Sequence, residues 1–577
     1  MKQIILVLSC IVIYSAVSAQ SLLPEKWKFK TGDNAEWSSV SFNDADWSSI
    51  TPGIVWEEQG FPGYDGYAWY RAIFTIPSKF RKDSENFGGL SLQLGKIDDV
   101  DFTYFNGELI GKTGELPPNY VSKYDEPRVY VIPASKVRWD EPNTIAVRVF
   151  DFTGNGGIYS DPVQLSVPGI ADKISIEPVF ERNDRIFVGP NNRINLQVNL
   201  KNEFSKSFKG KLNLKIDSDF HKEIYTQEKD ITLKNNKTFV ANFPVTEIDP
   251  GFYKAYVTFS NDMVTKKASF RFGYEPGKIV SPVNPQPDFA NYWARAKKEL
   301  AAVDPQYKVI KIDTLCTTRR NVYLVEMRSL GNILIRAWYS VPAKQGRYPA
   351  VMQVQGYSST IIPSYVDYGD DLIGFGLNIR GHGNSKDDIN PGFPGYLMCF
   401  LNDKELYVYR GAYMDCVRGI DFLFSCPEVD TTRVAVEGAS QGGALTFATA
   451  ALNNTRIKAC APQVPFLSDF AEYFKVASWP ANEFRNYVEV EKKQTWDQVY
   501  NTLSYIDIKN LAPWIKAPML MGSGLVDEVC PSRINFAAFN QVTAEKSYIV
   551  YPLSGHNLPQ DFYNRKMEWI RSKLEIK

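Results

Sequence analysis

The chain lacks a net charge, is poor in histidine and cysteine, and has no long apolar run beyond its first residues. Its 577 residues hold 65 Lys and Arg against 65 Asp and Glu, so the formal net charge is zero. A balanced chain offers no basic surface that would attract nucleic acid or an anionic membrane. We therefore predict no nucleic-acid partner and expect neutral ligands.

Cysteine usage predicts neither a metal site nor a particular disulfide. Beyond the first segment, the cysteines are scattered over the last half of the chain, and no pair has zinc-finger spacing. Disulfides and buried free thiols both stay open on this evidence. We predict no metal and no organic cofactor. These six residues are Cys316, Cys399, Cys416, Cys426, Cys460 and Cys530.

Residues 1–19 have the pattern of a cleavable signal peptide. One Lys precedes an apolar run over 4–13, and small residues at 17–19 match the preference of signal peptidase. The apolar run is too short to span a bilayer comfortably. We predict cleavage after Ala19, a secreted or periplasmic protein, and no membrane association after cleavage.

The rest of the chain is too long for one core, and its patterns predict three domains. Residues 20–167 and 168–277 each contain many short strands with period-2 alternation and turn dipeptides, which predicts two all-β sandwiches. A proline-rich linker follows. From 278 to 577 strands alternate with helices, which predicts a doubly wound, mostly parallel sheet.

The first β-rich segment resembles the galactose-binding-like jelly-roll domain that precedes many glycoside hydrolases and carbohydrate acetylesterases. The similarity rests on WYRAIFTIP, DDVDFTYFNGELIGKTG, NTIAVRVFD and GGIYSDPVQL. It implies the fold and leaves open whether this domain binds a sugar. The second segment, 168–277, is predicted as an immunoglobulin-like sandwich.

The sequence VAVEGASQGG, followed by a helix-prone segment, places Ser440 in a tight turn between a strand and a helix. A serine is a weak nucleophile unless its hydroxyl is exposed, oriented and given a base, and this turn supplies the exposure. The pentapeptide alone also occurs in ordinary glycine-rich loops. The flanking strand and helix favour a nucleophile.

Two residues after later strands are the predicted partners of Ser440. In α/β hydrolases the acid and then the histidine follow the serine, each at the end of a strand. Asp527 follows the apolar run APMLMGSG, and His556, one of three histidines in the chain, follows SYIVYPL. Glu528 competes with Asp527 for the acid role, and a solvated loop carboxylate is the alternative reading of Asp527.

Two backbone N–H groups are candidates for the oxyanion hole. One belongs to Gln441, directly after the nucleophile, and the other to Tyr357, in the glycine turn that ends the strand VMQV. An ordinary turn after a strand is the competing interpretation of Tyr357.

The last half of the chain resembles the acetyl xylan esterase and cephalosporin-C deacetylase family of α/β hydrolases. The matching strings are RGHGNS, YVYRGAYMDCVRGIDFLFSCPEVD, GASQGG and GLVDEVCPSRINFAAFN. The resemblance implies the triad Ser440, Asp527 and His556, and the oxyanion donors Tyr357 and Gln441.

Two positions depart from the family pattern, which leaves the substrate preference open. The family usually has glutamine at the position of His382 and glutamate at that of Asn557. Arg380 and His382 are predicted to shape the site, with a structural role favoured for both. Trp479, in the long segment between Ser440 and Asp527, either stacks a sugar or packs a cap over the pocket.

We therefore predict a secreted serine carbohydrate esterase that removes acetyl groups from plant oligosaccharides and polysaccharides, xylan-derived ones first. One alternative is an esterase for another acyl or methyl ester on a complex glycan such as pectin. An alternative of a different class is a carbohydrate-binding protein with an inactive hydrolase domain. The oligomeric state stays open.

Overall fold

The computed structural model describes residues 22–152, 154, 156–366, 368–393, 395–477 and 479–576. The predicted signal peptide lies outside these residues. The described chain divides into two compact units. The first contains the residues up to Ser175 together with Asn202–Ser205, and the second runs from Ile176 onwards. The domain boundaries at 167 and 277 stay predictions.

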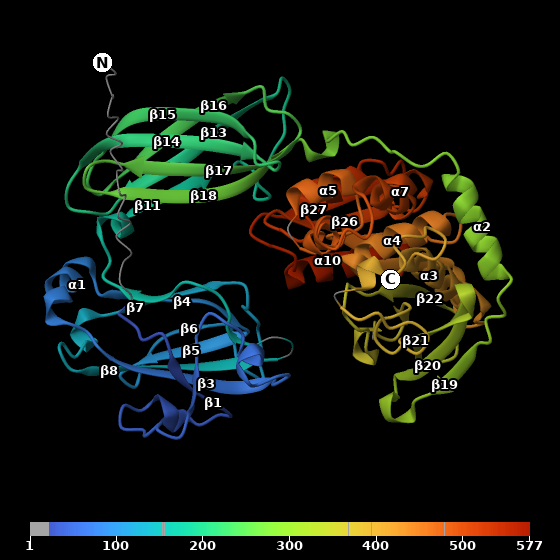
Figure 1. Ribbon diagram of the computed structural model, residues 1–577, viewed down its shortest axis with the longest axis horizontal. Coiled ribbons are helices and arrows are strands. Elements are labelled where there is room, and N and C mark those ends of the chain that lie inside the picture. The colour runs from blue at the N-terminus through green and yellow to red at the C-terminus, as the bar shows by residue number, and fades with distance from the viewer. Residues whose placement is uncertain are drawn as a thin grey trace, which may run out of the picture. The chain divides into compact units, whose positions relative to one another are not determined.

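The first unit is a sandwich of two antiparallel sheets (Figure 1). One sheet has the order β2-β1-β3-β8-β5-β6, the other has the order β10-β4-β7, and β9 pairs with β4. Its core is rich in aromatic side chains, among them the buried Trp27, Trp56 and Tyr70. The strands are β1 (Trp27–Thr31), β2 (Ser48–Ile50), β3 (Gly66–Thr75), β4 (Leu90–Asp98), β5 (Val100–Phe105), β6 (Glu108–Thr113), β7 (Pro127–Ile132), β8 (Pro142–Asp151), β9 (Gly157–Ile158) and β10 (Val163–Ser166), with helix α1 at Arg81–Phe87.

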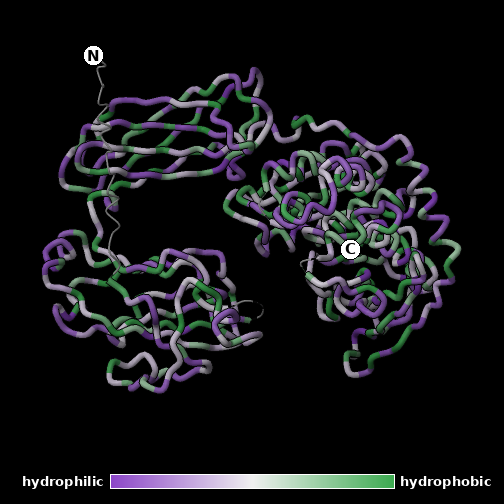
Figure 2. The backbone as a smooth tube through the Cα atoms, in the orientation of Figure 1, coloured by the Kyte–Doolittle hydropathy of each residue, from purple (hydrophilic) through white to green (hydrophobic). Residues whose placement is uncertain are grey.

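The second unit begins with another β-sandwich, whose sheets have the orders β11-β13-β16 and β12-β18-β17-β14-β15. Its strands alternate buried and exposed residues, as β13 does, because one face of each sheet packs on the core. Hydrophobic and hydrophilic residues, green and purple in Figure 2, alternate along these strands. The strands are β11 (Ile174–Val179), β12 (Ile186–Phe187), β13 (Arg193–Asn202), β14 (Phe208–Ser218), β15 (Glu223–Leu233), β16 (Lys237–Thr246), β17 (Gly251–Ser260) and β18 (Thr265–Tyr274).

A nine-stranded sheet organises the described residues after the linker, in the order β19-β20-β21-β23-β22-β24-β25-β26-β27. The pairs from β19 to β23 are antiparallel, and those from β23 through β22 to β27 are parallel. The strands are β19 (Lys308–Lys311), β20 (Arg320–Ser329), β21 (Ile333–Pro342), β22 (Tyr348–Val354), β23 (Ile373–Asn378), β24 (Val429–Ala439), β25 (Ala459–Gln463), β26 (Met519–Gly524) and β27 (Lys546–Tyr551).

Helices flank this sheet, and the central ones are almost fully buried. Every residue of α4 is buried, which fits its run of small and apolar residues. Among the helices of the described residues, none has the length and apolar character that a membrane span needs. The helices are α2 (Phe289–Ala301), α3 (Val408–Ser425), α4 (Gln441–Leu452), α5 (Phe470–Val476), α6 (Ala481–Arg485), α7 (Trp496–Ile506), α8 (Ile508–Leu511), α9 (Ser532–Phe539) and α10 (Gln560–Lys573).

The second sandwich shares a hydrophobic core with the α/β domain. Ile186 and Phe252 are buried in the same cluster as residues of the nine-stranded sheet. The ring of Phe252 lies 5.5 Å from that of Phe536 in α9. Asn540 also donates hydrogen bonds of 3.0 Å to the carbonyls of Pro276 and Ile279. The two domains therefore form one packed unit.

The structure confirms the predicted fold class: β-sandwiches precede a C-terminal α/β-hydrolase domain. It also resolves the question that the cysteines left open, because the thiols of all six are free.

Candidate active site

Ser440 occupies a strained position between strand β24 and helix α4. Its backbone has φ 61° and ψ −121°, a conformation that non-glycine residues rarely adopt. The Ser440 N–H donates to the carbonyl of Gln463 on the neighbouring strand β25 at 2.9 Å. The turn is therefore held to the sheet on one side and leads directly into the helix on the other.

Two glycines allow this turn to approach strand β22. A Cβ atom on Gly438 would lie 2.6 Å from the carbonyl oxygen of Val354, and one on Gly442 would lie 2.3 Å from the same oxygen. Neither distance is sterically possible for a side chain. This close approach explains why the predicted motif has glycine at both positions.

Asp527 and His556 meet at the ends of strands β26 and β27. His556 Nδ1 lies 2.9 Å from Asp527 Oδ2, while Asp527 Oδ1 accepts hydrogen bonds from the backbone N–H groups of Val529 and Cys530. The Asp527 side chain is fully buried, and that of His556 is 27% exposed. The carboxylate is thus fixed by its own loop and orients the imidazole.

The neighbouring Glu528 lies in a different environment. Its side chain is 72% exposed and pairs with Arg271 of β18 at 2.8 Å. It therefore points away from the imidazole that Asp527 holds.

Cys530 contacts both Ser440 and Asp527. Burial raises the pKa of the Cys530 thiol well above its usual value, and a hydrogen bond with the Ser440 side chain partly opposes this shift. Because the Cys530 backbone N–H also donates to Asp527, one residue contacts both Ser440 and the Asp527 carboxylate. No pattern in the sequence marks Cys530 as a neighbour of Ser440.

The two predicted oxyanion donors lie on either side of Ser440. Gln441 is the first residue of α4, and Tyr357 follows Gly356 in the turn after β22. A Cβ atom on Gly356 would lie 3.9 Å from the Cβ of Ser440, so this turn lies directly against the serine. Within the part of the chain that the structure describes, neither backbone N–H donates a hydrogen bond.

A buried polar chain fixes the side chain of Gln441. The hydroxyl of Tyr409 in α3 donates to Gln441 Oε1 at 2.7 Å, and Gln441 Nε2 lies 3.1 Å from Nε2 of His382. His382 Nδ1 in turn lies 3.4 Å from the carbonyl of Arg380. His382 is therefore placed to accept from Gln441 through Nε2 and to donate through Nδ1, as a neutral imidazole does.

Arg380 is buried and held by Asp415 of α3. Its Nε and Nη2 donate to the two carboxylate oxygens at 2.9 and 2.7 Å, and its backbone N–H donates to the same group. Neither Arg380 nor His382 is exposed. Arg380 contacts Asp415, and His382 contacts the side chain of Gln441; the structural role predicted for both stays a prediction.

Burial lowers the pKa of His382 to about 4, from an ordinary value of 6.5. Between pH 4 and pH 6.5 the imidazole is therefore neutral in the folded protein. The unfolded chain binds a proton at this imidazole. The stabilisation that the neutral imidazole of His382 contributes is therefore fully present above pH 6.5 and is lost as the pH falls towards 4. The full loss in the free energy of unfolding is about 3 kcal/mol. We expect the unfolding free energy of wild type to fall relative to His382→Gln across this window.

Urea unfolding of the two proteins between pH 7 and pH 4 measures this difference. Because both contain the same other titratable groups, the comparison isolates His382. Parallel pH profiles would contradict the assignment of a buried neutral imidazole.

Trp479 and Tyr357 both line a pocket of about 940 Å³. Trp479 is 44% exposed, and its ring lies 6.0 Å from that of Tyr357. The Tyr357 hydroxyl donates to Glu483 of α6 at 3.2 Å. Glu483 is a site residue that sequence reasoning missed, because 126 residues separate it from Tyr357.

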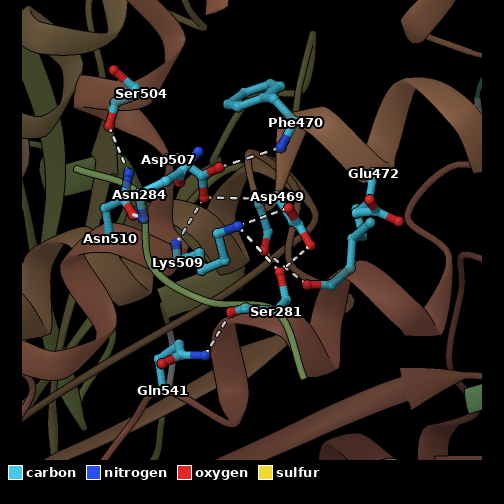
Figure 3. A network of polar contacts seen from close by, with 12 residues as sticks. Ser281, Asn284, Asp469, Phe470, Glu472, Ser504, Asp507, Lys509, Asn510 and Gln541 are labelled. Atoms are coloured by element: carbon cyan, nitrogen blue, oxygen red, sulfur yellow. Dashed lines mark hydrogen bonds and ion pairs between the residues drawn. The ribbon is translucent and has the colours of Figure 1, made fainter. Parts of the chain in front are cut away.

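A buried ionic network fixes the start of helix α5, which leads to Trp479 (Figure 3). Lys509 Nζ donates to Asp469 Oδ1 at 2.8 Å and to Ser281 Oγ at 3.1 Å, and the Asp469 backbone N–H donates to Asp507 at 3.0 Å. Burial raises the pKa of Asp507 to about 6. The network joins Ser281, in the chain before α2, to the segment that leads to Trp479.

Outside this site, three carboxyl groups lie together in the first unit. Within the described residues, ligand oxygens of Asp98, Asp99 and Asp151 all lie within 4.8 Å of one another. Burial, reinforced by the adjacent Asp99, raises the pKa of Asp98 to about 9. This spacing would suit a cation.

A mostly parallel sheet with a strained serine between strand and helix defines the α/β-hydrolase class. The model of the acetyl xylan esterase (AXE1) family matches residues 279–573, just over half of the chain. The chain belongs to the acetyl xylan esterase family. It is accordingly a carboxylic-ester hydrolase, and the family implies an acetylated carbohydrate as substrate.

The chain is also similar to individual proteins. The chain is 28% identical over 362 residues to acetyl esterase Axe7A of Xylanibacter ruminicola, covering 60% of this chain and 79% of that protein. Among solved structures, acetyl xylan esterase 1 from Thermoanaerobacterium sp. JW/SL YS485 and the acetyl xylan esterase from Paenibacillus sp. R4 are each 29% identical. Each aligns with 52% of this chain and 98% of its own, with a TM-score of 0.49.

Proposed function

We propose that this protein is a serine esterase that removes acetyl groups from plant oligosaccharides and polysaccharides, with xylan-derived ones first, through Ser440, His556 and Asp527. The family supports the acetyl esterase activity. The observation that carries the catalytic assignment is the 2.9 Å contact between His556 and Asp527 at the strand ends. The pattern of residues 1–19 supports a secreted or periplasmic location.

Acylation begins with the transfer of the Ser440 hydroxyl proton to Nε2 of His556. This nitrogen is free to accept because Nδ1–H donates to Asp527. The serine oxygen bonds to the acetyl carbonyl carbon, and the resulting oxyanion accepts hydrogen bonds from the N–H groups of Tyr357 and Gln441. The carbon–oxygen bond to the sugar then breaks, and His556 returns the proton to the leaving alkoxide.

Deacylation repeats these steps with water. His556 takes a proton from water, the hydroxide adds to the acetyl carbon, and the bond to the Ser440 oxygen breaks as His556 returns the proton to that oxygen. The acetic acid released loses its remaining proton to solvent and leaves as acetate. The burial of Asp527 matters in both steps, because a fixed carboxylate stabilises the imidazolium as it forms.

Product analysis on matched polysaccharides tests this function. We expect acetate release from acetylated xylan and its oligosaccharides, and no methanol release from methyl-esterified pectin. Chemically deacetylated xylan is the control that yields no acetate. Methanol release without acetate release would contradict the proposal and favour the pectic methyl-esterase alternative.

A further inference from the structure

The pocket beside Tyr357, here called the Trp479 pocket, has walls of aromatic and amide side chains. Trp479, Phe393 and Tyr487 supply the rings, and Asn482 and Asn486 supply the amides. Rings that stack on a sugar face and planar polar groups that bind hydroxyls are a combination suited to carbohydrates. The remaining lining residues are Tyr357, Ser358, Gly395, Met398, Glu483 and Glu491.

The pocket is much larger than the acyl group that the proposed reaction transfers. An acetyl group has two carbon atoms, whereas the Trp479 pocket measures about 940 Å³. Tyr357 lines this pocket, and its backbone N–H is the proposed oxyanion donor. A substrate held at Ser440 therefore has its sugar, the large part of the ester, available to enter the Trp479 pocket.

Charge in this pocket has one sign. Among the described residues that line it are Glu483 and Glu491 but no Lys, Arg or His, although the chain as a whole is neutral. Within the residues that the structure describes, neither glutamate forms an ion pair. Glu483 accepts from the Tyr357 hydroxyl at 3.2 Å, and Glu491 accepts from Asn486 at 2.7 Å, so neutral donors hold both carboxylates in place.

We propose that the Trp479 pocket binds the neutral sugar residues of the acetylated substrate and discriminates against sugars that carry a carboxylate. This inference rests on the proposed esterase function. Hydroxyl groups donate to the two glutamates, and Trp479, which is 44% exposed, offers a ring face for stacking. A uronate placed there meets two like charges and no cation among the lining residues that the structure describes.

The experiment compares acetylated xylo-oligosaccharides with the same oligosaccharides that carry one glucuronic acid branch next to the acetylated residue. We expect kcat/KM for acetate release to be about tenfold lower on the charged substrate, because like charges brought together in a site are costly. Raising the ionic strength is expected to narrow this ratio, since salt screens the repulsion. A purely steric effect of the branch would not respond to salt.

Variants that remove charge test whether Glu483 and Glu491 cause the lower kcat/KM on the charged substrate. The double variant Glu483→Gln, Glu491→Gln is expected to bring the ratio of the two kcat/KM values close to one. Glu489→Gln is the matched control, because Glu489 lies in the same helical segment, binds Trp496 and does not line the pocket. It is expected to leave the ratio at its wild-type value.

The outcomes separate the two proposals. Equal kcat/KM on both substrates in wild type, or a ratio that the double variant and salt leave unchanged, would overturn the charge discrimination alone. Absence of acetate release from both substrates would instead overturn the esterase function on which it rests.

Discussion

Replacement of Ser440 by alanine is expected to lower kcat for acetate release by roughly 10⁵- to 10⁶-fold, as loss of the nucleophile does in serine hydrolases. Without the hydroxyl no acyl-enzyme forms, and His556 has no proton to take from the nucleophile. The Ser440 backbone is strained in the native protein, and alanine keeps the same backbone and Cβ. The fold is therefore expected to persist.

Acetate release from an acetylated xylo-oligosaccharide and from p-nitrophenyl acetate measures this loss, with urea unfolding to verify the fold. Ser425→Ala is a suitable control, because that hydroxyl donates to the carbonyl of Phe422 in the helix α3, away from Ser440 in sequence. Full activity in a folded Ser440→Ala protein would show that another residue is the nucleophile.

Asp527→Asn is expected to reduce kcat by about 10⁴-fold while leaving the structure intact. The carboxylate accepts from His556 and from two backbone N–H groups. An amide in its place carries no charge to stabilise the imidazolium, and its NH₂ group can donate to the imidazole and stabilise the wrong tautomer.

Glu528→Gln provides the comparison for this prediction, since it removes the same charge one residue away. Because Glu528 is exposed and paired with Arg271, we expect a change in kcat of less than about threefold, as for exposed ion pairs. A larger loss in Glu528→Gln than in Asp527→Asn would reverse the assignment of the acid.

The fold was largely predictable because its signals are local. Strand-forming residues before Ser440 and small residues after it predict the turn that the structure contains, and the alternation of strands and helices predicts the parallel sheet. The order of serine, acid and histidine placed Asp527 and His556, which the structure brings into hydrogen-bond contact. Their catalytic roles stay predictions until the variants are measured.

The surroundings of the site were not predictable, because they depend on contacts between distant segments. The contact between Gln441 and His382 spans 59 residues, and the hydrogen bond from Tyr357 to Glu483 spans 126. Periodicity reports which face of an element is buried, but not which distant side chain it meets. The charge of the Trp479 pocket is likewise a property of the folded chain.

The shared core of the second sandwich and the α/β domain determines where the chain can be cut when the catalytic domain is fused to another protein. The family match starts at residue 279, yet Ile186 and Phe252, which precede it, are buried against the catalytic half. A domain that is cut at the family boundary would expose to water the hydrophobic surface that those two side chains cover. The transferable part of this enzyme therefore starts about a hundred residues earlier, near Ile176, where the compact unit begins.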